Sequence, residues 1–131
     1  MALKDADMQT SDIDYINAHG TSTKLNDLYE TRAIKAVFNE HSPSMAVSST
    51  KSMTGHLLGA AGVIEAIASI LSIVKGIVPP TINHFTDDDQ IDPGLNLTFN
   101  KAQKRDVKIA MSNTFGFWGH NACILFKKYE G

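Results

Sequence analysis

The sequence has 131 residues, of which 43% are hydrophobic and 20% are charged, so it fits one globular domain and not a disordered segment. Its formal net charge is −2 and it has no cluster of basic residues, which argues against a nucleic-acid or anionic-membrane partner. The single cysteine, Cys123, excludes an internal disulfide and favours a reducing compartment, here the cytoplasm.

The first third of the sequence predicts a helix end, a strand and a helix. Residues 1–8 carry charges where a signal peptide would be apolar, and we interpret them as the end of an amphipathic helix in a longer protein. Residues 13–18 alternate apolar and polar side chains, which is typical of a strand. Residues 26–38 show helical spacing, with Asn26 or Asp27 as the expected cap.

A long apolar helix is the main feature of the middle of the sequence. A short strand is expected at residues 45–48 and a polar loop after it, and the helix is expected at residues 55–74. Glu65 in its centre argues against a membrane span, since a central charge costs roughly 2.5–3.5 kcal/mol on insertion. Because its apolar residues surround the whole circumference, the helix needs cover on all sides. A domain of this size rarely supplies such cover, so we expect a missing half, a partner subunit or both.

The last part of the sequence predicts a surface excursion followed by a hairpin. Residues 86–100 are rich in turn-forming and acidic residues. Residues 107–112 and 121–128 read as strands that pair antiparallel around a turn at residues 113–120. Strands and helices alternate first and two strands then come together, so the expected fold class is α/β with a mixed sheet.

Three polar motifs stand out for their chemistry. The first is HGTST (residues 19–23), which follows a strand, and ligands of open α/β sheets bind beyond the carboxyl ends of strands. The second is STKSMTGH (49–56), which brings Lys51 and His56 to the start of the long helix, and the third is FGFWG (115–119). The glycine-rich run at 54–62 matches no nucleotide-binding pattern, and the remaining histidines lack metal-ligand spacing, so neither a nucleotide nor a metal is expected.

The motifs resemble, in order and spacing, the three C-terminal motifs of β-ketoacyl-[acyl carrier protein] synthases, which are condensing enzymes of the thiolase-like superfamily. The matching segments are HGTST (19–23), STKS (49–52) with TGHLLGAAG (54–62), and NTFGF (113–117). The resemblance covers nearly the whole chain and is strongest to the synthase II type of bacterial fatty-acid synthesis. It implies a thiolase-like three-layer α/β/α half-fold with a mixed sheet. Residues 1–131 would then form the C-terminal domain of a two-half enzyme that works as a homodimer.

The resemblance implies fatty-acid chain elongation by decarboxylative Claisen condensation. In this family a cysteine is acylated from acyl-ACP, malonyl-ACP loses CO2, and the resulting carbanion attacks the acyl-cysteine. The nucleophile belongs to an N-terminal motif, so Cys123 is interpreted as a buried small hydrophobic residue and the chain alone is expected to be inactive. The implied partners are acyl carrier protein and the N-terminal half. No cofactor is expected, because the substrates travel on the phosphopantetheine arm of the carrier protein.

Two alternatives stay open at this point. One is a polyketide ketosynthase, which uses the same chemistry. The other is a non-catalytic module, either a subunit like a chain-length factor or a fragment that binds acyl carrier protein. The residue at the position of the nucleophilic cysteine distinguishes these alternatives, because a non-catalytic partner lacks the thiol.

The same resemblance assigns roles in the condensation step. His19 and His56 would hydrogen-bond the malonyl thioester carbonyl as negative charge develops there. His56 is expected in the first turn of the long helix, where the positive end of the dipole disfavours its protonated form. Lys51 would orient the histidines electrostatically, and Glu30 would pair with Lys51.

The remaining assignments concern the bound substrate. Thr21 and Thr23 match threonines that hydrogen-bond the pantetheine arm. Phe115 and Phe117 belong to the acyl-binding motif, where the backbone N–H near Phe117 would form half of an oxyanion hole and its ring would gate the acyl pocket. Where the family usually has two glycines after the gating phenylalanine, this chain has Trp118 and Gly119.

Overall fold

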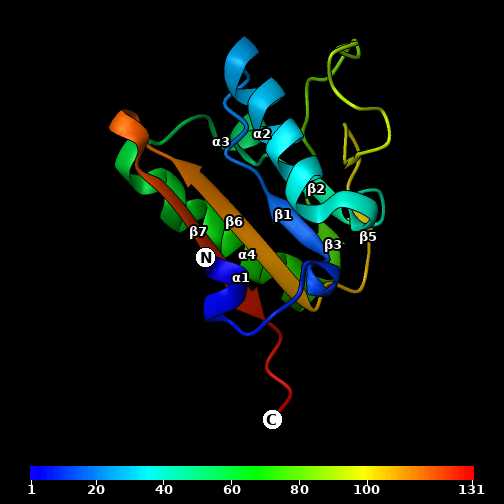
Figure 1. The fold of residues 1–131 in the computed structure, drawn as a ribbon, viewed down its shortest axis with the longest axis vertical. Helices are drawn as coiled ribbons and strands as arrows, with labels where there is room; N and C mark the ends of the chain where they lie inside the picture. Colours follow the sequence, from blue (N-terminus) through cyan, green and yellow to red (C-terminus); the bar gives the residue numbers. More distant parts are fainter.

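A mixed five-stranded sheet forms the centre of the fold (Figure 1). In this computed structural model the backbone is described throughout, as is every side chain except that of Phe117. The strand order is β4-β2-β1-β6-β7; all neighbours run parallel except β7, which is antiparallel to β6. The expected mixed sheet is therefore confirmed. The strands are β1 (Tyr15–Asn17), β2 (Ala46–Ser48), β4 (Asn96–Leu97), β6 (Ile109–Phe115) and β7 (Asn121–Lys127).

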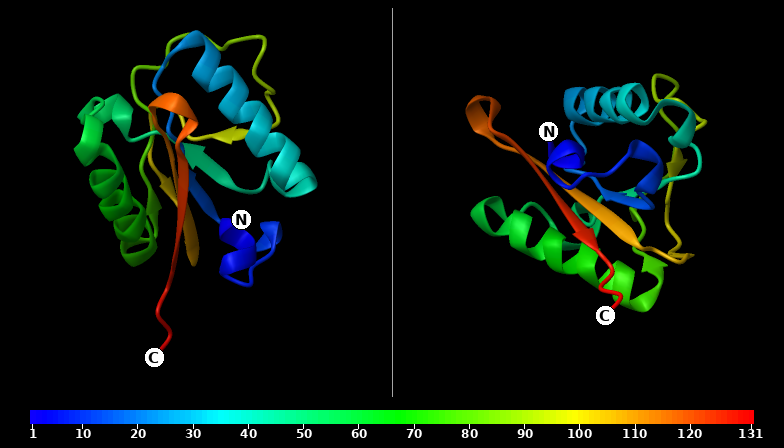
Figure 2. Two further views of the ribbon diagram at one scale, coloured as in Figure 1. Left: turned by 60° about the vertical axis from the view of Figure 1, so that its left-hand side comes forward. Right: turned by 60° about the horizontal axis from the view of Figure 1, so that its bottom comes forward.

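Helices cover both faces of this sheet, so the fold has three layers (Figure 2). The helix α2 (Lys24–Phe38) lies on one face, where its buried Ile34 and Phe38 join a core with Ile16 of β1. The helix α4 (Ala61–Lys75) lies on the other face, where Ile73 packs in a second core with Tyr15. The adjacent residues Tyr15 and Ile16 thus serve opposite faces, as the pleat of a strand requires.

Shorter elements complete the chain. They are α1 (Ala2–Asp5), α3 (Lys51–Thr54), the 3-10 turns η1 (Thr10–Asp12), η2 (Asn39–His41), η3 (Leu58–Ala60) and η4 (Phe117–Gly119), and a two-stranded sheet of β3 (Ile77–Val78) and β5 (Gln103–Lys104). The predicted hairpin of residues 107–128 is confirmed as β6 and β7, with Ile109 opposite Lys127 and Phe115 opposite Asn121. Its turn is shorter than expected, because β6 continues to Phe115.

The long helix predicted at residues 55–74 begins later than expected, and the polar loop predicted before it contains the short helix α3. The helix α3 ends at Gly55, whose φ of 72° is a left-handed conformation that glycine adopts without strain. The turn η3 follows, and α4 begins only at Ala61. His56 therefore lies in the link between α3 and η3, and the prediction that it occupies the first turn of the long helix is wrong.

The face of α4 that meets the sheet is polar apart from Ala61 and Ile73, and its apolar face is open. Glu65, Ser69 and Ser72 are buried. Six large apolar residues point outward with 36–67% exposure: Val63, Ile64, Ile67, Ile70, Leu71 and Val74. By length and composition alone, Leu58–Lys75 could cross a membrane, but Glu65 in its middle is buried and forms an ion pair with Lys51 of this chain. The helix needs cover on its outer face and not, as predicted, all round.

Two further expectations differ from the structure. Residues 86–100 are not only a surface excursion, because β4 extends the sheet at its edge and Leu95 and Thr98 are buried. Cys123 is exposed and not buried, because it lies on β7, an edge strand whose residues 121–124 are all exposed in this chain.

Parallel pairing decides where the polar motifs meet. The strands β1, β2 and β6 run in the same direction, so their carboxyl ends lie at one end of the sheet. His19 follows β1, Lys51 follows β2, and Phe115 ends β6. The three motifs, which are far apart in the sequence, therefore converge beyond that end.

Candidate active site

His19 is enclosed at the end of β1, with only 5% of its surface exposed. Burial first, and then electrostatic interactions with Lys51 and His56, lower its pKa from 6.5 to about 4. Its imidazole is therefore neutral near pH 7. The Nδ1 atom is buried and finds no hydrogen-bond partner within the described part of the chain.

A carboxylate fixes the backbone that carries His19. Glu30 of α2 is 4% exposed, and its two oxygens accept the N–H groups of His19 and Gly20, each at 2.9 Å. Gly20 has a φ of 41°, and a Cβ there would lie 2.5 Å from the Cβ of Ser49. Only glycine fits this close approach, so the loop after β1 is held in one position.

His56 lies beside His19 but is exposed. The two ring centroids are 5.5 Å apart and the ring planes are nearly perpendicular, at 87°. The Nδ1 atom of His56 accepts the backbone N–H of Leu58 at 3.1 Å. A neutral imidazole with Nδ1 as acceptor carries its proton on Nε2, so Nε2–H is left as a donor. A short backbone contact, and not the dipole of α4, thus decides the tautomer of His56.

Lys51 is buried and forms its ion pair with Glu65 of α4. The predicted pairing of Lys51 with Glu30 is wrong, because the carboxylate of Glu30 is occupied by the N–H groups of the loop after β1. Asn17 joins these parts: its side chain donates to Thr50 Oγ1 at 3.1 Å and to the backbone oxygen of Glu65 at 3.3 Å. The start of α3 is therefore tied to both β1 and α4.

The residues assigned to substrate binding lie around the histidines. The hydroxyls of Thr21 and Thr23 hydrogen-bond each other at 3.1 Å on the exposed side of the loop after β1. The ring of Phe115 lies 5.4 Å from that of His19, centroid to centroid. The assigned gate, the side chain of Phe117, lies outside the described residues.

Trp118 occupies a strained position at the tip of the hairpin. Its φ of 64° and ψ of 23° place a bulky residue in the left-handed region, and its side chain is 97% exposed. The backbone N–H of Gly116 donates to the oxygen of His120 at 2.6 Å and closes the turn. Strained residues of this kind concentrate at functional sites.

The arrangement suits the stabilisation of negative charge on an oxygen atom. Two neighbouring imidazoles can donate hydrogen bonds, one of them neutral because of burial and the other with a defined donor atom. A buried lysine–glutamate pair stands behind them. Donors that are already aimed at a developing oxyanion in a site protected from water lower a reaction barrier by several kcal/mol.

Comparison with known proteins assigns the family. Residues 1–85 match the family described as "Beta-ketoacyl synthase, C-terminal domain". The chain belongs to the β-ketoacyl synthase family. It is 54% identical over 129 residues to 3-oxoacyl-[acyl-carrier-protein] synthase 2 of Staphylococcus aureus (strain COL), which covers 98% of this chain and 31% of that protein. It is 51% identical over 131 residues to the protein of the same name from a Synechocystis species, covering 98% of this chain and 30% of the relative.

Solved structures of ketosynthases have the same fold. A type II polyketide ketosynthase in complex with its acyl-carrier protein superposes with a TM-score of 0.93 at 42% identity, covering 98% of this chain and 31% of that one. A β-ketoacyl synthase from Burkholderia phymatum gives a TM-score of 0.91 at 36% identity, with the same coverage. The expected thiolase-like half-fold is thereby confirmed. This β-ketoacyl synthase chain spans about three tenths of the length of the curated relatives that it matches.

Sequence reasoning missed two side chains of the candidate site in this β-ketoacyl synthase chain. Glu65 was noted only as a charge inside an apolar helix, although a charge in that setting needs a buried partner. Asn17 looks like an ordinary polar position of a strand in the sequence, although it is fully buried, accepts the backbone N–H of Thr50 and donates to the backbone oxygen of Glu65. The signal for Glu65 was present in the sequence, whereas nothing local identifies Asn17.

Proposed function

We propose that this chain supplies the histidines and the lysine of a β-ketoacyl synthase active site. The enzyme would elongate an acyl chain with malonyl-ACP. The observation that supports the proposal most is the pair of neighbouring imidazoles, His19 with its lowered pKa and His56 with a defined Nε2–H donor. When malonyl thioester loses CO2, negative charge moves to its carbonyl oxygen, and two neutral donors stabilise that charge. Lys51 and Glu65 stay paired and orient the histidines.

The cysteine that accepts the acyl group belongs, on this proposal, to an N-terminal part that the relatives carry. Cys123 is unsuitable as this nucleophile, because it lies inside β7, paired in register with Asn113, and not in a loop at the carboxyl ends of β1 and β2 that carries His19 or Lys51. We call the protein that joins this chain to such an N-terminal part the complete synthase. Residues 1–131 form its C-terminal domain, and the open apolar face of α4 is the surface that the N-terminal part covers.

The partners follow from the same reaction. The proposed substrates reach the site on the phosphopantetheine arm of acyl carrier protein, with Thr21 and Thr23 along the path of the arm and Phe115 and Phe117 at the acyl pocket. A ketosynthase with a closely similar fold is known in complex with its acyl-carrier protein, which supports this partner. We propose a cytoplasmic homodimer that needs no further cofactor.

A polyketide ketosynthase is the second candidate, and the similarity to the type II polyketide enzyme supports it. The identity of 54% to a 3-oxoacyl-ACP synthase 2 exceeds the 42% to the polyketide enzyme, which favours fatty-acid elongation. A subunit like a chain-length factor is less consistent with the chain, since a non-catalytic subunit has no need of two neutral imidazole donors.

The experiment joins the chain to the N-terminal part of the S. aureus relative and supplies acyl-ACP with malonyl-ACP. The complete synthase should form β-ketoacyl-ACP, and the 131-residue chain alone should form none, because imidazoles without the thiol cannot accept an acyl group. Product from the chain alone would contradict the proposal. Equal turnover of fatty acyl-ACP and of a poly-β-ketoacyl-ACP would favour the polyketide candidate.

A further inference from the structure

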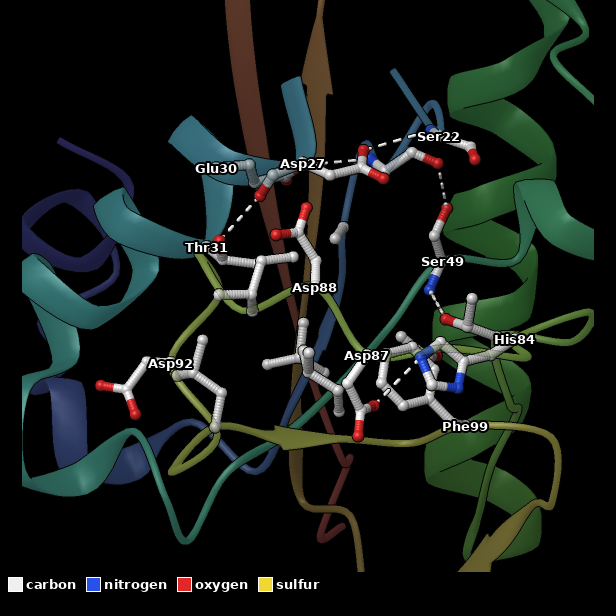
Figure 3. Close-up of a pocket in the computed structure, with 18 of the residues that line it drawn as sticks. Ser22, Asp27, Glu30, Thr31, Ser49, His84, Asp87, Asp88, Asp92 and Phe99 are labelled. Carbon is white, nitrogen blue, oxygen red and sulfur yellow. Dashed lines mark hydrogen bonds and ion pairs between the residues drawn. The ribbon is translucent and has the colours of Figure 1, made fainter. Parts of the chain in front are cut away.

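The two histidines of the candidate site are supported in different ways. Other segments hold the loop after β1, and Figure 3 shows two of the supporting side chains, Asp27 and Ser49, close to Ser22. Asp27 accepts the N–H of Ser22 at 3.1 Å, and Ser49 Oγ donates to a backbone oxygen of the loop at 3.0 Å. His56 lies instead in a link whose residues 55–60 are all exposed. The position of its ring therefore depends mainly on contacts within that link.

Leu58 has a strained backbone at the centre of the link. Its φ of 51° lies in the left-handed region, which is unfavourable for a residue with a Cβ. Its side chain is 72% exposed, so packing of that side chain does not account for the strain. Glycine adopts this conformation freely, and the link has glycines at positions 55 and 59 but leucine at 58. A strained residue that persists beside reacting groups points to a function.

The N–H of Leu58 is used by the side chain of His56. It donates to Nδ1 of that ring at 3.1 Å, across one intervening residue. A second local bond, from the N–H of Ala60 to the oxygen of Leu57 at 3.0 Å, closes the turn that follows. Because the ring of His56 is exposed, water competes for Nδ1. A single local donor keeps such a ring in place only if the backbone holds that donor still.

We infer that Leu58 is a positioning residue of the candidate site and that it acts through its backbone. The left-handed turn at Leu58 holds its N–H against Nδ1 of His56, which keeps the proton on Nε2. The same contact keeps the ring in its place 5.5 Å from that of His19, centroid to centroid. The inference rests on the proposed function, in which Nε2–H of His56 donates to the developing enolate.

Two substitutions separate the backbone of Leu58 from its side chain. Leu58→Gly and Leu58→Val both shorten the side chain, and both keep the backbone N–H. Glycine adopts the left-handed conformation without strain, whereas the branched Cβ of valine disfavours it more than leucine does. If Leu58 acts through its backbone, only Leu58→Val impairs His56. If Leu58 acts through its side chain, both substitutions do.

The test measures kcat and KM for the decarboxylation of malonyl-ACP by the complete synthase. We expect Leu58→Val to lower kcat about tenfold with little change in KM, because the donor is needed most in the transition state. Leu58→Gly should keep kcat within about threefold, since the left-handed turn stays accessible. The matched control is Leu57→Val, in the same link at an ordinary φ of −85°, and it should change neither constant.

A spectroscopic measurement on the 131-residue chain tests the contact without catalysis. Nuclear spin coupling through the hydrogen bond joins the amide nitrogen of Leu58 to Nδ1 of His56. We expect this coupling in the unchanged chain and in Leu58→Gly, and a weaker or undetectable coupling in Leu58→Val. Its absence from the unchanged chain would overturn the inference, because the contact would not exist in solution.

The kinetic outcomes are equally decisive. Equal kcat in all the variants would show that Leu58 does not position His56. Equal losses in Leu58→Gly and Leu58→Val would assign the effect to the side chain, which also overturns the inference. A complete synthase that does not decarboxylate malonyl-ACP would contradict the proposed function instead, and the spin coupling would then still decide whether Leu58 holds the ring of His56.

Discussion

Lys51 and Glu65 form an ion pair whose side chains are only 5% and 2% exposed. The pair joins α3 to α4 just behind the two histidines. A buried ammonium without its carboxylate is strongly destabilising, whereas a pair replaced as a whole by apolar groups need not be. The positive charge of Lys51 also contributes to the lowered pKa of His19, so the pair links the stability of the domain to the chemistry of the site.

Breaking this pair from one side should destabilise the chain more than removing it entirely. Glu65→Ala leaves the ammonium of Lys51 buried and unpaired, and should lower the free energy of unfolding by about 3–5 kcal/mol. The double variant Lys51→Met/Glu65→Leu should lose clearly less free energy of unfolding than Glu65→Ala. Urea denaturation of the chain measures both. Lys35→Met, which removes the exposed partner of Asp92, is the control and should change stability by about 1 kcal/mol or less. Equal losses in the single and the double variant would contradict the buried pair.

His19 should titrate far below an ordinary histidine. Its pKa of about 4 lies below the unfolded value of 6.5, so the unfolded state binds the proton more tightly. Stability should therefore be unaffected by this group above about pH 6.5 and should fall as the pH drops toward 4. Lys51→Met removes a positive charge and should raise the pKa, while Lys75→Met at the far end of α4 should not. The pKa of His19 is measured by proton NMR of its imidazole Cε1–H as the pH is varied. A titration midpoint near pH 6.5 would show that the pKa of His19 is not lowered.

The open face of α4 should make the isolated chain associate. Six large apolar residues on one helix form a surface that soluble monomers rarely expose. We expect self-association in light scattering and binding of a dye that detects apolar surface. Ile67→Lys/Leu71→Lys should reduce both, whereas Val37→Lys on α2, also an exposed apolar position, should not. A monomer without dye binding would show that the face needs no partner.

Trp118 should limit acylation. Tryptophan in the left-handed region is strained by roughly 1–2 kcal/mol, and Trp118→Gly removes that strain. In the complete synthase a large side chain beside the gate should slow acylation more than malonyl decarboxylation, because gating loops often set turnover. Single-turnover kinetics with short and long acyl-ACPs compare the two proteins. We expect faster acylation in the variant, most of all for long chains. Identical rates at every chain length would show that Trp118 is neutral.

The layers and the meeting of the motifs could be predicted from the sequence, because they depend on local patterns. A strand is indicated by the alternation at residues 13–18, a helix by the spacing at 26–38, and a hairpin by the two strands around 113–120. Parallel strands then bring their carboxyl ends to one end of the sheet. The start of the long helix was misread, since the apolar run begins at Leu57 whereas the backbone first forms the turn η3 and α4 begins only at Ala61.

The pairings inside the site could not be predicted, because they depend on contacts between distant segments. Glu30 and Glu65 are both acidic residues of helices, and nothing in the local sequence shows that one meets backbone N–H groups and the other meets Lys51. The polar character of the buried side of α4 was missed for a related reason. The sequence predicts a helix that is apolar all round, whereas in the structure Glu65, Ser69 and Ser72 are buried and the apolar side faces away from the sheet.

The most direct test of the account separates decarboxylation of malonyl-ACP from acylation of the cysteine in the complete synthase. On the proposed function, His19→Ala and His56→Ala each remove one donor to the developing enolate, and losing such a donor lowers the rate about 10²–10³-fold. We predict that each variant loses decarboxylation to this extent and keeps a substantial part of its acylation, while His41→Ala, remote from the site, keeps both. Normal decarboxylation with loss of acylation alone would contradict the account.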